Sequence, residues 1–313
     1  MVNNKEKNFI SIVIYVHNNE KIIADFLKKI NVQFAENFSN YEIICVNDNS
    51  TDSSVLEIRR VISNIEKTVI SIINMSRYQG TEIAMNAGVD LAIGDFIFEF
   101  DNINIDYNLD IIMQVYNKAL NGFDIVSAQP NKKKRFTSKI FYRILNKNAD
   151  FMYNINTESF RILSRRAINR IKSMNITIPY RKAVYANCGL KSDVLEYKLL
   201  KQTYSKLPKE IRKTRKETAI NSIVLFTDVA YKFAIIMSII MMLLTVGIGI
   251  YTVYVFLCKS AIEGWTTIML LLSISFFGIF AILTIMIKYL SIIINLIFKK
   301  QKYLIESIEK ITK

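Results

Sequence analysis

Two carboxylates lie at the end of a short hydrophobic segment near residue 100. Residues 96–100 read Phe-Ile-Phe-Glu-Phe, an aromatic and β-branched run that predicts a buried strand. Glu99 and Asp101 are two residues apart, so on a strand they share one face. Ligands of open α/β sheets bind beyond the carboxyl ends of strands, where a carboxylate holds a divalent cation, a ribose hydroxyl, or a diphosphate through a cation. The segment alone leaves an alternative open, in which Asp101 caps the next helix, near Asp106 and Asp110.

Three earlier strands are predicted, and each also ends in polar side chains. The apolar runs at residues 9–16, 41–46 and 69–74 are rich in Ile and Val, and a helical segment is predicted after each. Strands that alternate with helices predict a doubly wound, mainly parallel α/β sheet. A nucleotide would lie at the carboxyl ends of its strands, beside the polar segments His17-Asn18-Asn19-Glu20, Asn47-Asp48-Asn49-Ser50 and Arg77-Tyr78-Gln79-Gly80.

Basic side chains follow in the middle of the chain. One run is either a solvated loop or a contact for a lipid phosphate, and it comprises Lys132, Lys133, Lys134 and Arg135. Residues 138–145 are amphipathic and suit either a helix at a membrane interface or a helix packed on the core. Arg161 lies in a short apolar strand, and an arginine fork binds phosphate in a geometry that lysine does not reproduce.

Two long apolar segments occupy most of the last third of the chain. Residues 233–258 and 264–287 carry no charge, and each segment is long enough to cross a bilayer. The short connection predicts a helical hairpin, and basic flanks on both sides place both ends in the cytoplasm. The predicted organisation is a cytoplasmic domain over 1–205, a basic juxtamembrane segment over 206–232, two spans within 233–287 and a basic cytoplasmic tail over 288–313. We expect residues 303–311 of that tail to lie along the membrane surface.

The composition narrows the classes of function. The chain has 313 residues and a formal net charge of +14, without a nucleic-acid-binding motif, so anionic lipid or a phosphorylated substrate explains the charge better than nucleic acid. The three cysteines are scattered and His17 is the only histidine, which argues against Ser-His-Asp catalysis and histidine-based zinc sites. The first residues lack the apolar core of a cleavable signal peptide, so the N-terminal domain is expected in the cytoplasm.

Four ordered sequence blocks resemble family 2 glycosyltransferases of the GT-A fold, a Rossmann-like α/β fold. The blocks are residues 14–20, 41–52 and 76–95, followed by the acidic segment that begins at Asp101. The first two are similar to the family patterns Pro-Val-Tyr-Asn-Glu and Asp-Asp-Gly-Ser-x-Asp. Within the family the chain looks most like the polyprenyl-phosphate sugar transferases, the group of bacterial lipid glucosyltransferases and dolichol-phosphate mannose synthase. The resemblance implies an inverting transfer of a sugar from a nucleotide-diphosphate sugar.

The resemblance also implies where the nucleotide binds. Asp48 and Glu20 would contact the base and the ribose, and the third block would lie near the same nucleotide. The full set of expected nucleotide contacts is Asn18, Glu20, Asp48, Ser50, Arg77 and Gly80.

The acidic segment departs from the family pattern Asp-Ala-Asp-Leu-Gln-Asp. Asp101 matches the first aspartate and Asp106 the last, but Ile103 replaces the second metal-binding aspartate. Isoleucine cannot coordinate the Mg²⁺ or Mn²⁺ that the resemblance implies. Three interpretations stay open. Either Glu99 and Asp101 form a shifted metal-binding pair, or Asp101 holds the metal with Asn102 or Asn104, or the protein has lost activity.

The acceptor region departs from the family as well. Ser127-Ala128-Gln129 replaces the usual Gly-Ser-Arg, so Arg161 and residues 132–135 are expected to hold an acceptor phosphate. We expect a working enzyme of the bacterial inner membrane that acts on a polyprenyl phosphate, with Asp101, Asp106 and Arg161 as catalytic residues. A hydroxyl acceptor would require a base, for which Asp106 and Glu158 are the candidates. The alternatives are transfer to a lipid-linked or surface glycan and a catalytically silent partner that binds nucleotide-sugar, and a homo-oligomer packed through the spans is left open.

Overall fold

The computed structural model describes most of the N-terminal two thirds of the chain and a short C-terminal segment. The described residues are 5–63, 65, 68–131, 136–149, 151–174, 180–200, 209–227 and 303–311, with scattered single residues and pairs between 229 and 293. The chain divides into two compact units, of which the first comprises Met1–Asn146, Asp150–Ala219 and Gln301–Lys313, and the second Lys147–Ala149 and Ile220–Lys300. The candidate site lies in the first unit.

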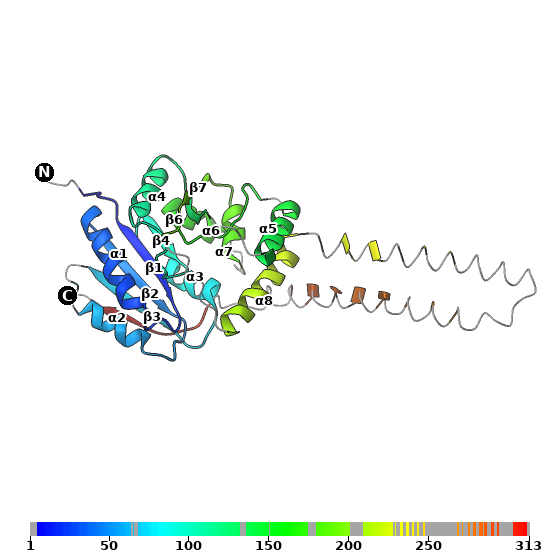
Figure 1. Ribbon diagram of the computed structural model, residues 1–313, viewed down its shortest axis with the longest axis horizontal. Coiled ribbons are helices and arrows are strands. Elements are labelled where there is room, and N and C mark those ends of the chain that lie inside the picture. Colours follow the sequence, from blue (N-terminus) through cyan, green and yellow to red (C-terminus); the bar gives the residue numbers. More distant parts are fainter. Residues whose placement is uncertain are drawn as a thin grey trace, which may run out of the picture. The chain divides into compact units, whose positions relative to one another are not determined.

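A mixed sheet forms the centre of the first unit (Figure 1). Over the described residues it has eight strands, in the order β7-β5-β6-β4-β1-β2-β3-β8. The strands are β1 (Ile10–Val16), β2 (Tyr41–Asn47), β3 (Val69–Met75), β4 (Phe96–Phe100), β5 (Ile125–Pro130), β6 (Phe160–Ser164), β7 (Ser192–Tyr197) and β8 (Ile305–Ile311). The helices are α1 (Ile23–Asn37), α2 (Ser54–Ile62), α3 (Thr81–Leu91), α4 (Asp110–Leu120), α5 (Phe136–Asn148), α6 (Arg165–Ser173), α7 (Arg181–Ala186) and α8 (Lys209–Phe226).

The strand order reverses in the middle of the sheet, and this reversal sets the position of the functional edge. β1 pairs in parallel with β2 and with β4, and β2 pairs in parallel with β3. The chain places β2 and β3 on one side of β1 and then returns to place β4 on the other side. Ligands of open α/β sheets bind beyond the carboxyl ends of strands at such a reversal. β6 and β8 run antiparallel to their neighbours, and the predicted α/β, mainly parallel sheet is confirmed.

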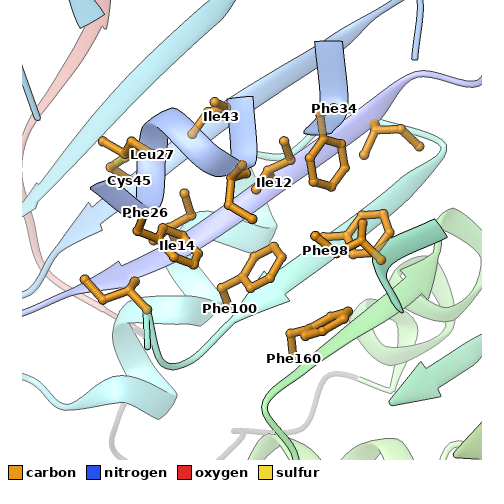
Figure 2. Packing of buried hydrophobic residues seen from close by; sticks show 14 of the residues in the cluster. Ile12, Ile14, Phe26, Leu27, Phe34, Ile43, Cys45, Phe98, Phe100 and Phe160 are labelled. Carbon is orange, nitrogen blue, oxygen red and sulfur yellow. The ribbon is translucent and has the colours of Figure 1, made fainter. Parts of the chain in front are cut away.

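Aromatic side chains cover one face of β4. Phe98 and Phe100 pack in the core with Phe34 of α1 and Phe160 of β6 (Figure 2). The Phe34 and Phe98 ring centroids lie 5.1 Å apart in an edge-to-face contact, and the Phe100 and Phe160 rings stack with centroids 5.1 Å apart. Because side chains alternate along a strand, Glu99 projects from the opposite face of β4. The core thus fixes the strand that carries the acidic segment.

Gly88 lets α3 approach the sheet closely. A Cβ atom on Gly88 would lie 2.3 Å from Val13 Cγ1 and 2.7 Å from Val46 Cγ2, on β1 and β2. We expect Gly88→Ala to lower the free energy of unfolding by about 1–3 kcal/mol, because overpacking a filled core forces backbone shifts. Thermal unfolding measures the change. In a double-mutant cycle, Val13→Ala should cost less in the Gly88→Ala background than in the wild type, and equal costs would contradict the contact.

The C-terminal segment forms an edge strand, and our expectation that residues 303–311 lie along a membrane surface is wrong. β8 pairs antiparallel with β3. Arg59 of α2 donates to both carboxylate oxygens of Glu309, at 3.1 and 2.7 Å, and Asn74 of β3 donates to Ser307 Oγ at 3.0 Å. Two of the polar side chains that made the segment look amphipathic, Ser307 and Glu309, therefore bind β3 and α2.

The predicted hairpin over residues 233–287 falls largely outside the described residues. None of the described helices is long and apolar enough to cross a bilayer. Within the predicted juxtamembrane segment, residues 209–226 form α8. The two spans and the cytoplasmic placement of both ends stay predictions.

Candidate functional site

The loops that follow β1 and β2 are tied together by hydrogen bonds. Asn18 Oδ1 accepts from the backbone N–H of Thr51 at 2.8 Å, and the Asn18 N–H donates to Ser50 Oγ at 3.1 Å. Glu20 Oε2 accepts from the N–H of Ser53 at 3.1 Å. Three of the expected nucleotide contacts therefore lie together at the carboxyl edge of the sheet, namely Asn18, Glu20 and Ser50.

Asp48 is fully buried and holds the loop that follows β3. Its carboxylate accepts from the N–H groups of Gln79 and Gly80, both at 2.8 Å, and from the Tyr15 hydroxyl at 3.0 Å. Burial raises the pKa of Asp48, and the hydrogen bonds from Gln79, Tyr15 and Gly80 only partly oppose that rise. The structure thus makes Asp48 an internal anchor of the loop, and its predicted contact with a nucleotide stays a prediction.

His17, the residue after β1, contacts the backbone of Asp48. Its Nδ1 lies 2.7 Å from the backbone carbonyl oxygen of Asp48. A carbonyl only accepts, so in the neutral ring Nδ1 carries the proton and Nε2 the lone pair. The His17 ring is buried, with its centroid 4.6 Å from that of Tyr78.

Helix α8 and Leu304, the residue before β8, hold the other side of the loop after β3. The Gln79 side chain donates to the Leu304 carbonyl at 2.7 Å and accepts from the Leu304 N–H at 3.0 Å. The Tyr78 hydroxyl donates to Thr214 Oγ1 at 3.3 Å. Gly80 has a φ of 86°, and a Cβ there would lie 2.9 Å from Thr214 Cγ2, so both the backbone and the space require glycine.

The two predicted metal ligands, Glu99 and Asp101, face a buried arginine of β6. Arg161 is the register partner of Glu99 across the β4–β6 pair, and its Nη1 lies 3.1 Å from Glu99 Oε2. Arg161 Nη2 donates to Asp101 Oδ2 at 2.6 Å, and Nε lies 3.0 Å from Glu158 Oε2. Only 2% of the Arg161 side chain is exposed. Its guanidinium is therefore committed to three carboxylates of the protein itself.

Arg181, at the start of α7, completes this cluster. Its Nη1 donates to Glu99 Oε1 at 2.7 Å, its Nη2 donates to Asp101 Oδ1, and its Nε donates to Glu82 Oε2 at 3.2 Å. The side chain is fully buried. Tyr185, four residues later in α7, donates to Glu99 Oε1 at 2.9 Å. Our sequence reasoning missed Arg181 because no motif surrounds it, and the weak signal was the spacing that places it and Tyr185 on one helical face.

The arginines also set the ionisation of Asp101. Burial alone would raise its pKa, but Arg181, Arg161 and Lys182 outweigh burial and hold the pKa of Asp101 well below its usual value. The carboxylate is therefore charged at neutral pH, and each of its oxygens already accepts from a guanidinium.

This arrangement does not fit the expected Mg²⁺ or Mn²⁺. Ile103, in place of the second aspartate, is buried in the apolar core, and the side chains of Asn102 and Asn104 bond to each other. Such cations require several oxygen ligands, and each oxygen of Asp101 already accepts from a buried guanidinium, whose positive charge opposes a cation at the same place. In the part of the chain that the structure describes, no group of three His, Cys, Asp or Glu side chains is arranged to hold a metal ion.

The lowered pKa of Asp101 gives a pH-dependent contribution to stability. A carboxyl whose pKa is lower in the folded than in the unfolded state stabilises the fold above the unfolded value, near 4, and this contribution is lost as pH falls through the folded value. We expect Asp101→Asn to be less stable than the wild type at pH 7. The difference between their unfolding midpoints should shrink below about pH 4. Unfolding midpoints measured from pH 7 to pH 3 check this, and a gap that stays constant with pH would contradict the ion pairs.

The remaining predicted residues have other surroundings. Asp106 Oδ1 accepts from the Tyr197 hydroxyl at 2.8 Å and is not part of the arginine cluster. Glu158 lies 3.0 Å from Arg161 and 3.8 Å from Lys182 Nζ. Arg77 is exposed and lies in the loop that Asp48 anchors. The basic run Lys132, Lys133, Lys134 and Arg135 lies outside the described residues.

The sequence profile of one known family matches this region. The profile described as Glycosyl transferase family 2 matches residues 11–172, just over half of the chain. The chain belongs to glycosyl transferase family 2. The match runs from β1 into α6 and contains Asp48, Asp101 and Arg161, whereas Arg181 and β8 lie beyond it. The glycosyltransferase that the sequence blocks indicated is thereby confirmed at the level of the family.

Curated proteins of similar sequence carry glycosyltransferase names. The uncharacterized glycosyltransferase YkcC of Bacillus subtilis is 28% identical over 272 residues, which are 83% of this chain and 82% of that protein. The uncharacterized glycosyltransferase sll0501 of Synechocystis is 30% identical and shares 58% of each chain. A prophage bactoprenol glucosyl transferase homolog of Escherichia coli is 30% identical over 60% of this chain and 62% of its own length. The chain therefore spans less than two thirds of the latter two relatives.

Similar solved structures are glycosyltransferases as well. A mannosyltransferase from Pyrobaculum calidifontis, in complex with GDP-Man and Mn²⁺, has a TM-score of 0.49 at 12% identity, over 70% of this chain and 64% of that one. Glucosyl-3-phosphoglycerate synthase from Mycobacterium tuberculosis, in complex with Mn²⁺, UDP and phosphoglyceric acid, has a TM-score of 0.49 at 11% identity, over 69% and 78%.

Proposed function

We propose that the protein transfers a sugar from a nucleotide-diphosphate sugar to a polyprenyl phosphate at the cytoplasmic face of a bacterial inner membrane. Family membership supports the sugar transfer. The observation that carries the proposal is a polar rim at the carboxyl ends of β1, β2 and β3, next to the strand reversal. We call residues 17–20, 48–53 and 77–80 the donor rim, and these loops are hydrogen-bonded to one another.

The reaction is a single displacement at the anomeric carbon. An oxygen of the acceptor phosphate attacks that carbon, the bond from the carbon to the donor diphosphate oxygen breaks, and the nucleoside diphosphate leaves with the bonding electrons. The configuration inverts. Because the acceptor oxygen is already anionic at neutral pH, the protein mainly positions the two substrates and requires no strong base.

The surroundings of the candidate bases favour a phosphate acceptor over a hydroxyl. A hydroxyl must lose its proton to a base within hydrogen-bond reach. Glu158 is 8% exposed and paired with Arg161, and one oxygen of Asp106 is bonded to Tyr197. Glu158 is therefore not presented as a free proton acceptor, and Asp106 is presented with one of its two oxygens already bonded. Arg161 is expected from the sequence to hold the acceptor phosphate, but it is buried among carboxylates. Exposed basic residues would therefore hold that phosphate instead.

Two further observations support a lipid acceptor at a membrane. Several relatives are named bactoprenol glucosyl transferase, at 28–30% identity. The apolar segments at 233–258 and 264–287 have the length of spans and basic flanks. Before the first of them, α8 exposes four basic side chains, Arg212, Lys213, Arg215 and Lys216.

The test is sugar transfer in membranes that contain the full chain. Membranes are incubated with a panel of radiolabelled nucleotide sugars and extracted with organic solvent. We expect label in a lipid from which mild acid releases a monosaccharide, and none in membranes without the protein. Label in a polymer instead would mean transfer to a glycan. Titration calorimetry that shows nucleotide-sugar binding without any transfer by the purified protein would mean a silent partner.

A further inference from the structure

We propose that the protein binds its sugar donor without a divalent cation, and that Glu99 and Asp101 are counter-ions of Arg161 and Arg181 rather than metal ligands. The inference rests on the proposed function for the identity of the donor. The chain lacks oxygen ligands that a divalent cation would need. A cation such as Mn²⁺ takes several oxygen ligands, and the family pattern supplies a second aspartate where this chain has buried Ile103.

The two remaining carboxylates are already satisfied by protein groups. Asp101 accepts from Arg161 through one oxygen and from Arg181 through the other. Glu99 is fully buried, and its Oε1 accepts from Arg181 and Tyr185 while Oε2 lies 3.1 Å from Arg161 Nη1. A cation that replaced these partners would leave buried guanidinium groups without their counter-charges, which is strongly unfavourable.

The guanidinium groups of Arg161 and Arg181 are held in place and cannot readily rotate away from the carboxylates. Arg181 is held by Glu82, Glu99 and Asp101, and it is fully buried. Arg161 is held by Glu99, Asp101 and Glu158, and it is 2% exposed. Lys182 also lies beside Glu158. The cluster thus has four carboxylates and three basic side chains, namely Glu82, Glu99, Asp101 and Glu158 with Arg161, Arg181 and Lys182. A divalent cation would therefore meet two fixed positive charges and little uncompensated negative charge.

Asp101 keeps a role that requires no metal. Its side chain is 20% exposed at the carboxyl end of β4, beside the strand reversal. A carboxylate oxygen offers more than one acceptor position, so Asp101 accepts a hydroxyl of the ribose or of the sugar while both arginines hold it in place. Asp101 would then contact the donor, and Arg161 and Arg181 would be positioning residues that act through it.

The first arm of the test uses Mn²⁺ alone. Purified full-length protein and Asp101→Asn are titrated with Mn²⁺, and the free ion is followed by electron paramagnetic resonance. We expect the same free Mn²⁺ at every point in both proteins. A bound ion in the wild type that Asp101→Asn loses would overturn the inference. The result of this arm does not depend on nucleotide binding.

The second arm measures UDP and GDP binding by calorimetry in EDTA and in excess Mn²⁺. We expect dissociation constants within about threefold of each other in the two buffers, and Asp101→Asn should change the affinity by the same factor in both. Binding at least about tenfold tighter in Mn²⁺, with that gain lost in Asp101→Asn, would overturn the inference. Absence of nucleotide binding in both buffers would instead count against the proposed function.

Discussion

Replacing Arg181 with methionine is expected to lower the free energy of unfolding by about 3–5 kcal/mol. Arg181 is fully buried and faces Glu82, Glu99 and Asp101, so its loss leaves fully buried Glu99 and two partly buried carboxylates with too few counter-charges. Methionine fills much of the same volume, so the effect reports the charge rather than a cavity. Arg181→Lys should recover only part of the loss, because one ammonium cannot reproduce the fork that joins three carboxylates. Thermal unfolding of the full chain in detergent measures the series.

The matched control is another arginine that is paired with a carboxylate near the surface. The side chains of Arg59 and Glu309 are 48% and 30% exposed, so Arg59→Met should cost less than about 1 kcal/mol. If Arg181→Met were no more destabilising than Arg59→Met, the buried cluster would not exist as described.

The second large effect is expected at Asp48. Its two oxygens receive N–H donors from Gln79 and Gly80, and one of them also accepts from the Tyr15 hydroxyl. An asparagine at this position would have the same shape, but its amide NH₂ would face a donor, and an amide has only one acceptor oxygen. We expect Asp48→Asn to cost about 2–4 kcal/mol and to weaken nucleoside diphosphate binding by about tenfold or more. Thermal unfolding and calorimetric titration check the two effects.

A surface carboxylate provides the control for this substitution. Asp25 of α1 is 67% exposed and pairs with Lys29, one helical turn further along the same helix. Asp25→Asn should change stability by no more than about 0.5 kcal/mol and leave nucleotide binding unchanged. Wild-type nucleotide affinity in a folded Asp48→Asn would show that nucleotide binding does not depend on this anchor.

The central strands could be predicted because their signal is local. The Ile- and Val-rich runs of β1, β2 and β3 are each bounded by polar residues, and Phe96–Phe100 alternates aromatic side chains with one glutamate. The position of Asp101 at the carboxyl end of β4 follows from that pattern. β8 could not be predicted in the same way, since its alternation of Ile, Glu and Ser also suits a surface segment. Only the pairing with β3 and the contact of Glu309 with Arg59 distinguish the two.

The role of the carboxylates in the cluster could not be predicted from local sequence. Glu99 and Asp101 have the spacing of a metal-binding pair, and nothing between residues 96 and 107 indicates a basic partner. Their partners come from distant segments, Arg161 through the antiparallel register of β6 and Arg181 through a short helix outside the family match. The replacement at Ile103 was the one local sign that this site differs from the family pattern.

Binding of the sugar donor at the donor rim is tested most directly by hydrogen exchange of the full-length protein with and without a nucleoside diphosphate. A donor held at the carboxyl ends of β1, β2 and β3 should slow the exchange of backbone amides in residues 17–20, 48–53 and 77–80. Amides of β7, on the far side of the sheet order, should be unchanged. Unaltered exchange throughout the donor rim under saturating UDP and GDP, or protection confined to other segments, would contradict the claim that this rim binds the sugar donor.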